Sequence, residues 1–295
     1  MAMKGAHFQF FSVIKPLQWG LALVLFLLLG ACSSTTFLYN RLDFILPWYL
    51  DDYVDLNRDQ KVLLDTSLKP FLRWHRATEL PRYVQVLNNI EHSLDRPVTH
   101  ATAAHIFSEV ELAWLRLEDE ALGWLLELGA GLTDGQIEEF LGVLQEQQGE
   151  YEQEYLERSD AQYLKDSYDN FEDSLQDYLG RLNQAQREVL HEASTDLMRM
   201  DTPWLHERAI WLEKLSVLLQ RKPGWQRRLR EQKAAREQNY SPQYLTMYGH
   251  NLEVIQGALS SVIDSRSAKQ DRRLRNKIKN LKEDLETLIA QGASQ

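Results

Sequence analysis

Hydrophobic residues recur along most of the chain at the three- and four-residue spacing of an α-helix. This spacing predicts helices over 39–50, 58–78, 80–94, 99–128, 133–157, 160–179, 184–200, 203–220, 225–238, 242–263 and 267–290. We expect Pro47 and Pro70 to bend or interrupt their helices, because proline lacks the amide hydrogen of the helix ladder. No stretch shows convincing strand alternation. The pattern therefore predicts an all-α fold, an elongated multi-helix bundle.

The last of these helices carries a short coiled-coil-like seam. Its apolar positions alternate four and three residues apart over about two heptads. They are Leu274, Ile278, Leu281, Leu285 and Leu288. We expect the seam to pack on the body of the protein or on a second copy, so that an oligomer would form through it. The arginines and lysines of this helix are expected to face outward.

Three of the predicted helices begin with the same short pattern, Leu-Asn/Thr-x-x-Gln. The copies are Leu56-Asn57-x-x-Gln60, Leu132-Thr133-x-x-Gln136 and Leu182-Asn183-x-x-Gln186. An Asn or Thr at a helix start accepts a hydrogen bond from a free backbone amide, and a Gln three residues later returns one. We therefore interpret the repeats as helix-capping boxes. Their unequal spacing argues against a solenoid.

The N-terminus has the organisation of a secretory signal. Lys4 and Lys15 precede an apolar run over 17–29, and the run ends just before Cys32, the single cysteine of the chain. The segment Leu-Gly-Ala-Cys at 29–32 resembles a bacterial lipobox, which implies cleavage before Cys32 and its lipidation. We therefore expect a signal peptide over 1–31 and a lipidated tether over 32–38. The serines after Cys32 resemble the signal for the outer membrane, which we favour over the inner membrane.

Charge divides the remaining sequence into an acidic helical domain over 39–220 and basic C-terminal helices over 221–295. Residues 32–220 hold 16 lysines and arginines against 35 aspartates and glutamates, whereas 221–295 hold 15 against 8. We expect the basic helices to pack on the same domain. The formal charge of −10 for the whole chain disfavours nucleic acid as a partner.

No motif in the sequence indicates catalysis or a cofactor. A Glu-x-x-His occurs once, at 188–191, whereas a di-metal bundle needs two. Glycine-rich phosphate loops and nucleophile elbows are missing. We therefore expect neither enzymatic activity nor a metal or cofactor. The strongest candidates for an interaction surface are aromatic and acidic residues next to the anchor: Trp48, Tyr49, Asp51, Asp52, Tyr53 and Asp55.

Two resemblances bear on function. The run Y-N-x-L-D followed by W-Y-x-D-D-Y-V-D-L, after a lipobox, resembles a family of uncharacterised lipoproteins of gammaproteobacteria. This resemblance implies a location but no activity. The Leu-Thr-x-x-Gln copy at 132–136 resembles the repeat of the Spy-type periplasmic chaperones, helical cradles that hold unfolded chains.

Together these observations predict a lipoprotein anchored to the periplasmic side of the outer membrane. We expect it to bind another envelope protein or to assist envelope assembly without catalysing a reaction. Two alternatives stay open: a holdase-like chaperone, and an enzyme that acts on an envelope polymer.

Overall fold

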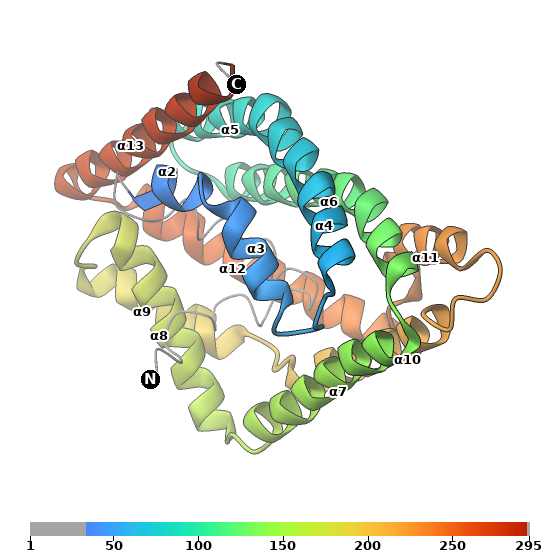
Figure 1. The fold of residues 1–295 in the computed structure, drawn as a ribbon. Coiled ribbons are helices and arrows are strands. Elements are labelled where there is room, and N and C mark those ends of the chain that lie inside the picture. Colours follow the sequence, from blue (N-terminus) through green and yellow to red (C-terminus); the bar gives the residue numbers. More distant parts are fainter. Residues whose placement is uncertain (1–33, 294–295) are drawn as a thin grey trace, which may run out of the picture.

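The computed structural model describes residues 34–293, and every regular element within them is helical. The prediction of an all-α fold is thus confirmed for this part of the chain (Figure 1). The elements are α2 (Ser34–Tyr39), α3 (Leu42–Leu50), α4 (Arg58–Trp74), η2 (His75–Glu79), α5 (Leu80–Ser93), α6 (His100–Gly131), α7 (Asp134–Leu156), α8 (Asp160–Leu179), α9 (Gln184–Asp196), α10 (Asp201–Leu218), α11 (Trp225–Ala234), η3 (Glu237–Asn239), α12 (Pro242–Asp264) and α13 (Ala268–Ala293). The expected signal peptide and Cys32 lie outside the described residues.

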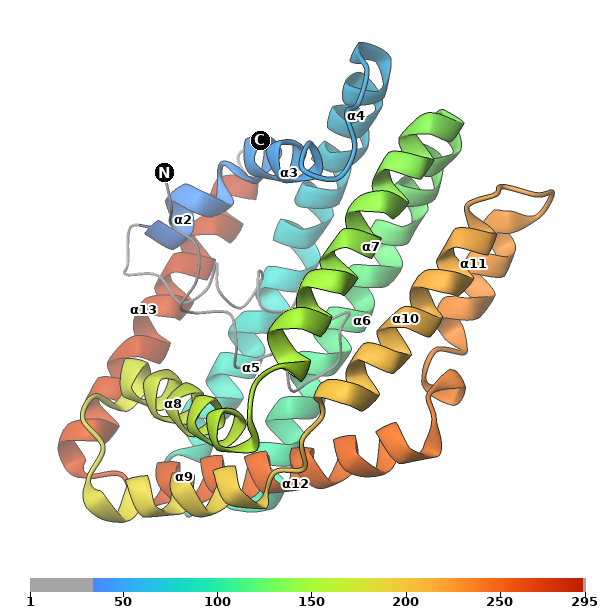
Figure 2. The same cartoon turned by 90° about the horizontal axis from the view of Figure 1, so that it is seen from below.

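The helices form a four-sided frame (Figure 1). The sides are the pairs α5–α13, α4–α6, α7–α10 and α8–α9. Helix α12 crosses behind the frame and packs on α6 and α9. Helices α2 and α3 lie on the opposite face, as the view from below shows (Figure 2). The frame therefore has one face covered by α12 and another covered by the segment that follows the expected anchor.

The largest hydrophobic core lies where α5, α8, α9, α12 and α13 meet. Phe171, Leu190 and Val262 are at its centre and are nearly inaccessible to solvent. A second core joins α2 and α3 to α5 and α13 through Tyr39 and Leu80. Burying such side chains stabilises the fold by about 1.5–3 kcal/mol each. These cores hold opposite ends of the chain together.

The three Leu-Asn/Thr-x-x-Gln repeats form capping boxes at the starts of α4, α7 and α9. At α7, for example, Thr133 Oγ1 accepts a hydrogen bond from the Gln136 amide at 3.2 Å, and Gln136 Oε1 accepts one from the Thr133 amide at 2.9 Å. The leucines that precede two of the caps, Leu56 and Leu182, are buried. The repeat thus fixes the start of a helix and anchors the preceding loop in the core.

The glutamines of these capping boxes also pair with one another. Gln60 Nε2 donates to Gln136 Oε1 and Gln136 Nε2 donates to Gln60 Oε1, both at 2.8 Å. Gln186 pairs in the same reciprocal way with Gln270, at 3.2 and 2.9 Å. The two pairs, which we call the glutamine clasps, join the starts of helices that lie far apart in sequence. The sequence alone does not reveal this second role.

Gln270 belongs to a further capping box that the sequence pattern missed. The Ser267 amide donates to Gln270 Oε1 at 2.9 Å, and the Gln270 amide donates to Ser267 Oγ at 3.3 Å, at the start of α13. An arginine precedes this copy where the other copies have leucine, so the five-residue pattern does not find it.

The seam of α13 packs on the body of the same chain. Leu274 and Ile278 join the largest core, whereas Leu285 and Leu288 join the second core and are fully buried. Leu281 is partly buried beside them. These side chains are therefore covered within one chain.

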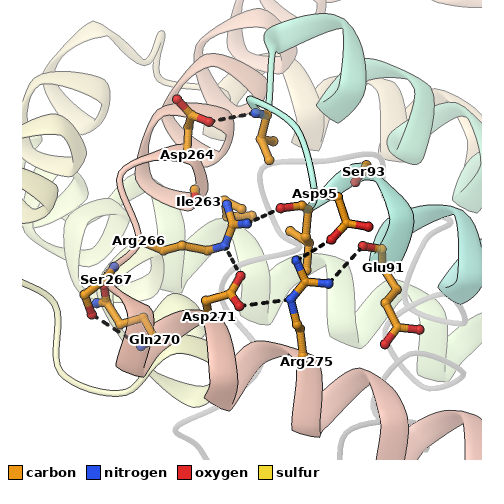
Figure 3. Close-up of polar contacts among 12 residues, drawn as sticks. Glu91, Ser93, Asp95, Ile263, Asp264, Arg266, Ser267, Gln270, Asp271 and Arg275 are labelled. Carbon is orange, nitrogen blue, oxygen red and sulfur yellow. Dashed lines mark hydrogen bonds and ion pairs between the residues drawn. The ribbon is translucent and has the colours of Figure 1, made fainter.

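The basic residues of α13 do not all face outward as we expected. Arg275 bonds Asp95 at 2.9 Å and Asp271 at 2.9 Å, beside the turn that precedes α13 (Figure 3). Lys282 pairs with Glu91 on α5. Partial burial alone would raise the pKa of Asp271, but hydrogen bonds from Arg266 and Arg275 outweigh this effect and lower the pKa. The acidic end of α5 thus neutralises part of the basic tail.

Several predicted boundaries are wrong. The expected tether is helical from Ser34, and the break falls at Asn40–Arg41 rather than at Pro47, which lies inside α3. Pro70 likewise lies inside α4, and the irregularity comes later, at η2. Helix α9 ends at Asp196 because 197–200 leave the helix and bury Met200, while the Met198 amide donates to Asn251 Oδ1 at 2.9 Å.

Candidate functional site

A large apolar cavity of about 760 Å³ lies inside the frame, beneath α3. Its walls come from α2, α3, α4, η2, α5, α6, α7, α10, α11 and η3. Leucines and aromatic residues dominate the lining, among them Leu46, Phe71, Trp114, Leu122 and Trp211. The volume is within the range of roughly 300–1,000 Å³ that small-molecule sites occupy. The cavity is therefore the main candidate for a functional site in the described chain.

The lining of the cavity reaches solvent on more than one helix. Tyr49 on α3 and Leu125 on α6 line the cavity and are still 44% and 42% exposed, and Asn239 on η3 is a further exposed residue of the lining. The hydroxyls of Tyr49 and Tyr53 lie 2.9 Å apart, and Tyr53 also accepts a hydrogen bond from Gln147 at 3.3 Å. Burial is the main cause of the raised pKa of Tyr49, and the hydrogen bond with Tyr53 raises this pKa further. The phenol of Tyr49 therefore stays neutral at physiological pH.

The structure separates the six residues proposed as an interaction surface. Tyr49 and Tyr53 line the cavity, whereas Trp48 is 62% exposed on α3 and is not part of the lining. The carboxylate of Asp51 pairs with Lys61 at 3.2 Å. Asp52 is exposed. The backbone of Asp55 is held by two side chains of α7, since Gln136 Nε2 donates to its carbonyl at 2.6 Å and its amide donates to Glu139 Oε2 at 3.3 Å.

A buried histidine stands at one end of the cavity. His75 is the first residue of the π-helical turn η2 and is 6% exposed. Its Nδ1 lies 2.8 Å from the Tyr39 hydroxyl and its Nε2 lies 3.4 Å from the Tyr83 hydroxyl. Burial lowers the pKa of His75 to about 4 and raises that of Tyr39 to about 12. The three rings therefore form a neutral polar group in an otherwise apolar wall.

An ion pair holds the π-helical turn against α6. Glu79 is completely buried, and the guanidinium of Arg116 bonds both of its carboxylate oxygens at 2.9–3.1 Å. Arg82 adds a further bond at 2.7 Å. A buried carboxylate needs such partners, because its isolated charge would be costly in a protein interior. This ion pair fixes η2 and with it the position of His75.

Arg208 brings a different polar group to the α10 wall of the cavity. It is 7% exposed, and its Nη1 donates to Gln148 Oε1 at 2.6 Å while its guanidinium lies 5.1 Å from the Tyr151 ring centre. Weaker contacts reach the Leu144 carbonyl at 3.4–3.5 Å. Burial lowers the pKa of Arg208. Within residues 34–293 no ion pair joins Arg208 to a carboxylate, so its charge is hydrogen-bonded but not neutralised.

The two carboxylates in the cavity lining are already engaged. Glu118 pairs with Arg236 at 3.0 Å and accepts a hydrogen bond from Trp114 Nε1 at 2.8 Å. Glu207 accepts one from the Ser241 amide at 2.9 Å, at the start of α12. Both acids therefore have structural partners in this conformation.

A sequence model of one family covers most of this cavity. It matches residues 52–245, about two thirds of the chain. The chain belongs to DUF6279, a family of unknown function. The DUF6279 match contains every residue that lines the cavity except five, all in or next to α3: Tyr39, Leu42, Leu46, Tyr49 and Leu50. The walls of the cavity thus belong to the DUF6279 region, whereas its cover precedes that region.

The remaining comparisons add no relative. Neither the curated proteins nor the solved structures include a significant match to the chain. Membership of DUF6279 agrees with the expected uncharacterised family, while the lipobox and the likeness to Spy-type chaperones stay predictions from the sequence. Within 34–293, no helix is long and apolar enough to cross a bilayer. In the same range, histidines, aspartates and glutamates form no group suited to a metal ion.

Sequence reasoning missed the residues that give the cavity its character. His75, Glu79, Arg116 and Arg208 belong to no motif, and they meet partners from other helices. A partial signal was present at Arg208, because a cation lies among the apolar residues Leu205, Trp211 and Leu212 of one helix. This signal is weak without the fold, since a charge on a helix is usually solvated.

Proposed function

We propose that this protein is a non-enzymatic binding protein of the bacterial envelope, whose cavity holds the hydrocarbon part of an anionic amphipathic ligand such as a long-chain carboxylic acid. The observation that supports it most is the 760 Å³ cavity with a predominantly leucine and aromatic lining. Each methylene moved from water into such a site contributes about 0.8 kcal/mol. A chain of a dozen methylenes would thus gain enough to offset the cost of immobilisation.

The acidic end of the ligand is suggested by Arg208. A guanidinium prefers the planar, two-oxygen geometry of a carboxylate or phosphate. Arg208 offers its positive charge from the wall of the cavity, where the low dielectric strengthens ionic attraction. Trp124, which also lines the cavity, has a buried Nε1 without a hydrogen-bond partner among the described residues. Both groups are donors, which favours an acceptor such as an oxyanion.

The proposal keeps the predicted setting. Cys32 would anchor the protein to the periplasmic face of the outer membrane, and another envelope protein would deliver or receive the ligand. A holdase would use the same cavity differently, by taking up apolar side chains of an unfolded client. An enzyme acting on an envelope polymer would need a free acid or base, and the two cavity carboxylates are engaged elsewhere.

The test compares a long-chain acid with the alcohol of equal chain length, by displacement of a fluorescent apolar probe from the purified mature chain carrying Cys32→Ser. Ala121→Trp places a large ring in the cavity and should weaken both ligands at least roughly tenfold. Ala101→Trp on the exposed surface of the same helix is the matched control and should change neither. Arg208→Gln should weaken the acid but not the alcohol.

Two outcomes would overturn the proposal. Equal loss of binding in the Ala101 and Ala121 variants would place the ligand outside the cavity. Suppression of client aggregation that depends on Ala121, without binding of either ligand, would favour the holdase. If Arg208→Gln weakens the alcohol as strongly as the acid, the cavity binds hydrocarbon but Arg208 does not select the head group.

A further inference from the structure

The outer face of α2 and α3 carries the most exposed aromatic residues of the described chain. Phe37, Phe44 and Trp48 are 60%, 70% and 62% exposed. Phe44 and Trp48 are four residues apart and therefore share one face of α3. The opposite face of the same helix, with Leu42, lines the cavity. Helix α3 is thus apolar on both sides, and only its inner side is covered by the protein.

We propose that this outer face, which we call the aromatic face (Phe37, Phe44 and Trp48), docks on a phospholipid bilayer. Large exposed apolar patches on a soluble protein usually mark an interaction surface. Tryptophan in particular is enriched at membrane interfaces, where its ring meets both acyl chains and water. A helix that lies in the interface plane buries one apolar face to a shallow depth.

The position of the aromatic face in the chain identifies the bilayer as its occupant. Phe37 follows the expected lipidation site, Cys32, by five residues, which span at most about 18 Å when fully extended. A lipid on Cys32 would therefore keep the aromatic face at the membrane surface. The two views place α2–α3 on one side of the frame, away from α9 and α12, so the face is not enclosed by other helices (Figures 1 and 2).

Charge plays the smaller part in this docking. Arg41 lies between the aromatic residues, with its guanidinium 5.5 Å from the Phe37 ring centre, and can meet a lipid phosphate. Asp43, Asp51 and Asp52 are exposed nearby and would be repelled by an anionic surface. Burial of the aromatic rings must therefore provide most of the attraction. The docking should consequently depend little on salt concentration.

Docking through the aromatic face would also orient the cavity. Because Tyr49 is an exposed residue of the cavity lining and lies next to Trp48 in α3, this part of the cavity would lie near the membrane surface. An amphipathic ligand could then pass between the bilayer and the cavity without crossing water. This consequence rests on the proposed function, whereas the docking itself does not.

The experiment measures flotation of the mature chain with phosphatidylethanolamine–phosphatidylglycerol vesicles. Cys32→Ser removes the lipid, so that only the protein surface can bind. Adding Phe44→Ser and Trp48→Ser should lower the partition coefficient by roughly tenfold or more. The matched control is Val62→Ser with Val217→Ser, because these valines are 59% and 55% exposed on α4 and α10. The control should leave partitioning unchanged.

The proposal is overturned if the parent chain does not float, or if the control pair lowers flotation as much as the aromatic pair. It is also overturned if the aromatic pair instead abolishes self-association in sedimentation, since the occupant would then be a second copy. Circular dichroism verifies that the variants fold. Binding of the long-chain acid should be the same in the aromatic variant and its parent without vesicles, which separates this proposal from the proposed function.

Discussion

Replacing Gln186 by alanine is expected to destabilise the protein far more than removal of an ordinary helix cap. Gln186 is 1% exposed and forms one glutamine clasp with Gln270, which is also buried. Its Oε1 accepts hydrogen bonds from the Asn183 amide at 3.0 Å and from Gln270 Nε2 at 2.9 Å. Its Nε2 donates to the Val262 carbonyl at 3.3 Å and to Gln270 Oε1 at 3.2 Å.

The magnitude follows from the groups that Gln186→Ala would leave behind. A hydrogen bond contributes about 0.5–1.5 kcal/mol to stability, and a buried polar group left without a partner costs about 1–3 kcal/mol. Gln270 keeps its bonds to the Arg181 carbonyl and the Ser267 amide, so it is only partly orphaned. We therefore expect a loss of about 3–5 kcal/mol, against about 1 kcal/mol for Thr133→Ala, which removes one capping oxygen.

Chemical denaturation of the mature chain, followed by circular dichroism, measures this loss. Gln184→Ala is the control, because Gln184 lies on the same helix and makes one exposed hydrogen bond, to Glu188. Its effect should stay within about 0.5 kcal/mol. The double variant with Gln270→Ala should show a coupling energy of about 1–2 kcal/mol. A loss near 1 kcal/mol for Gln186→Ala, or no coupling, would refute the clasp as a tertiary link and leave only a cap.

Three further predictions follow from single features of the fold. Burial lowers the pKa of His75 to about 4 from 6.5, so that between these pH values the unfolded chain binds a proton that the folded chain excludes. The free energy of unfolding should therefore fall by about 2–3 kcal/mol between pH 7 and 4.5 because of His75. The His75→Gln variant should lose less stability than the wild type over that range. Leu285→Ala should cost about 2–5 kcal/mol in the same assay, because Leu285 of α13 is fully buried in the second core. Arg275→Gln, which removes partly exposed ion pairs, should cost about 1 kcal/mol, and the reverse order would mean that charge holds the tail. Cys32→Ser should abolish acylation and leave an unprocessed precursor in cells, and fatty-acid label retained by the variant would contradict the lipobox.

Helix α13 shows how far a local sequence pattern can predict a tertiary contact. Its seam indicated which residues pack, and four of the five are buried. The pattern did not distinguish the body of the same chain from a second copy, because a hydrophobic stripe is equally satisfied by either. The decision comes from geometry: α13 lies against α5 and α8, so both cores already cover the seam.

Helical class, most helix starts and the burial stripes were determined by the sequence itself, because these features depend on residues three or four positions apart. The capping boxes at Asn57, Thr133 and Asn183 are of this kind. The glutamine clasps and the cavity were decided only by the tertiary structure. Gln60 and Gln136 are 76 residues apart, and Arg208 meets Gln148 across 60 residues. No local spacing specifies such meetings, since they arise only when the whole frame has packed.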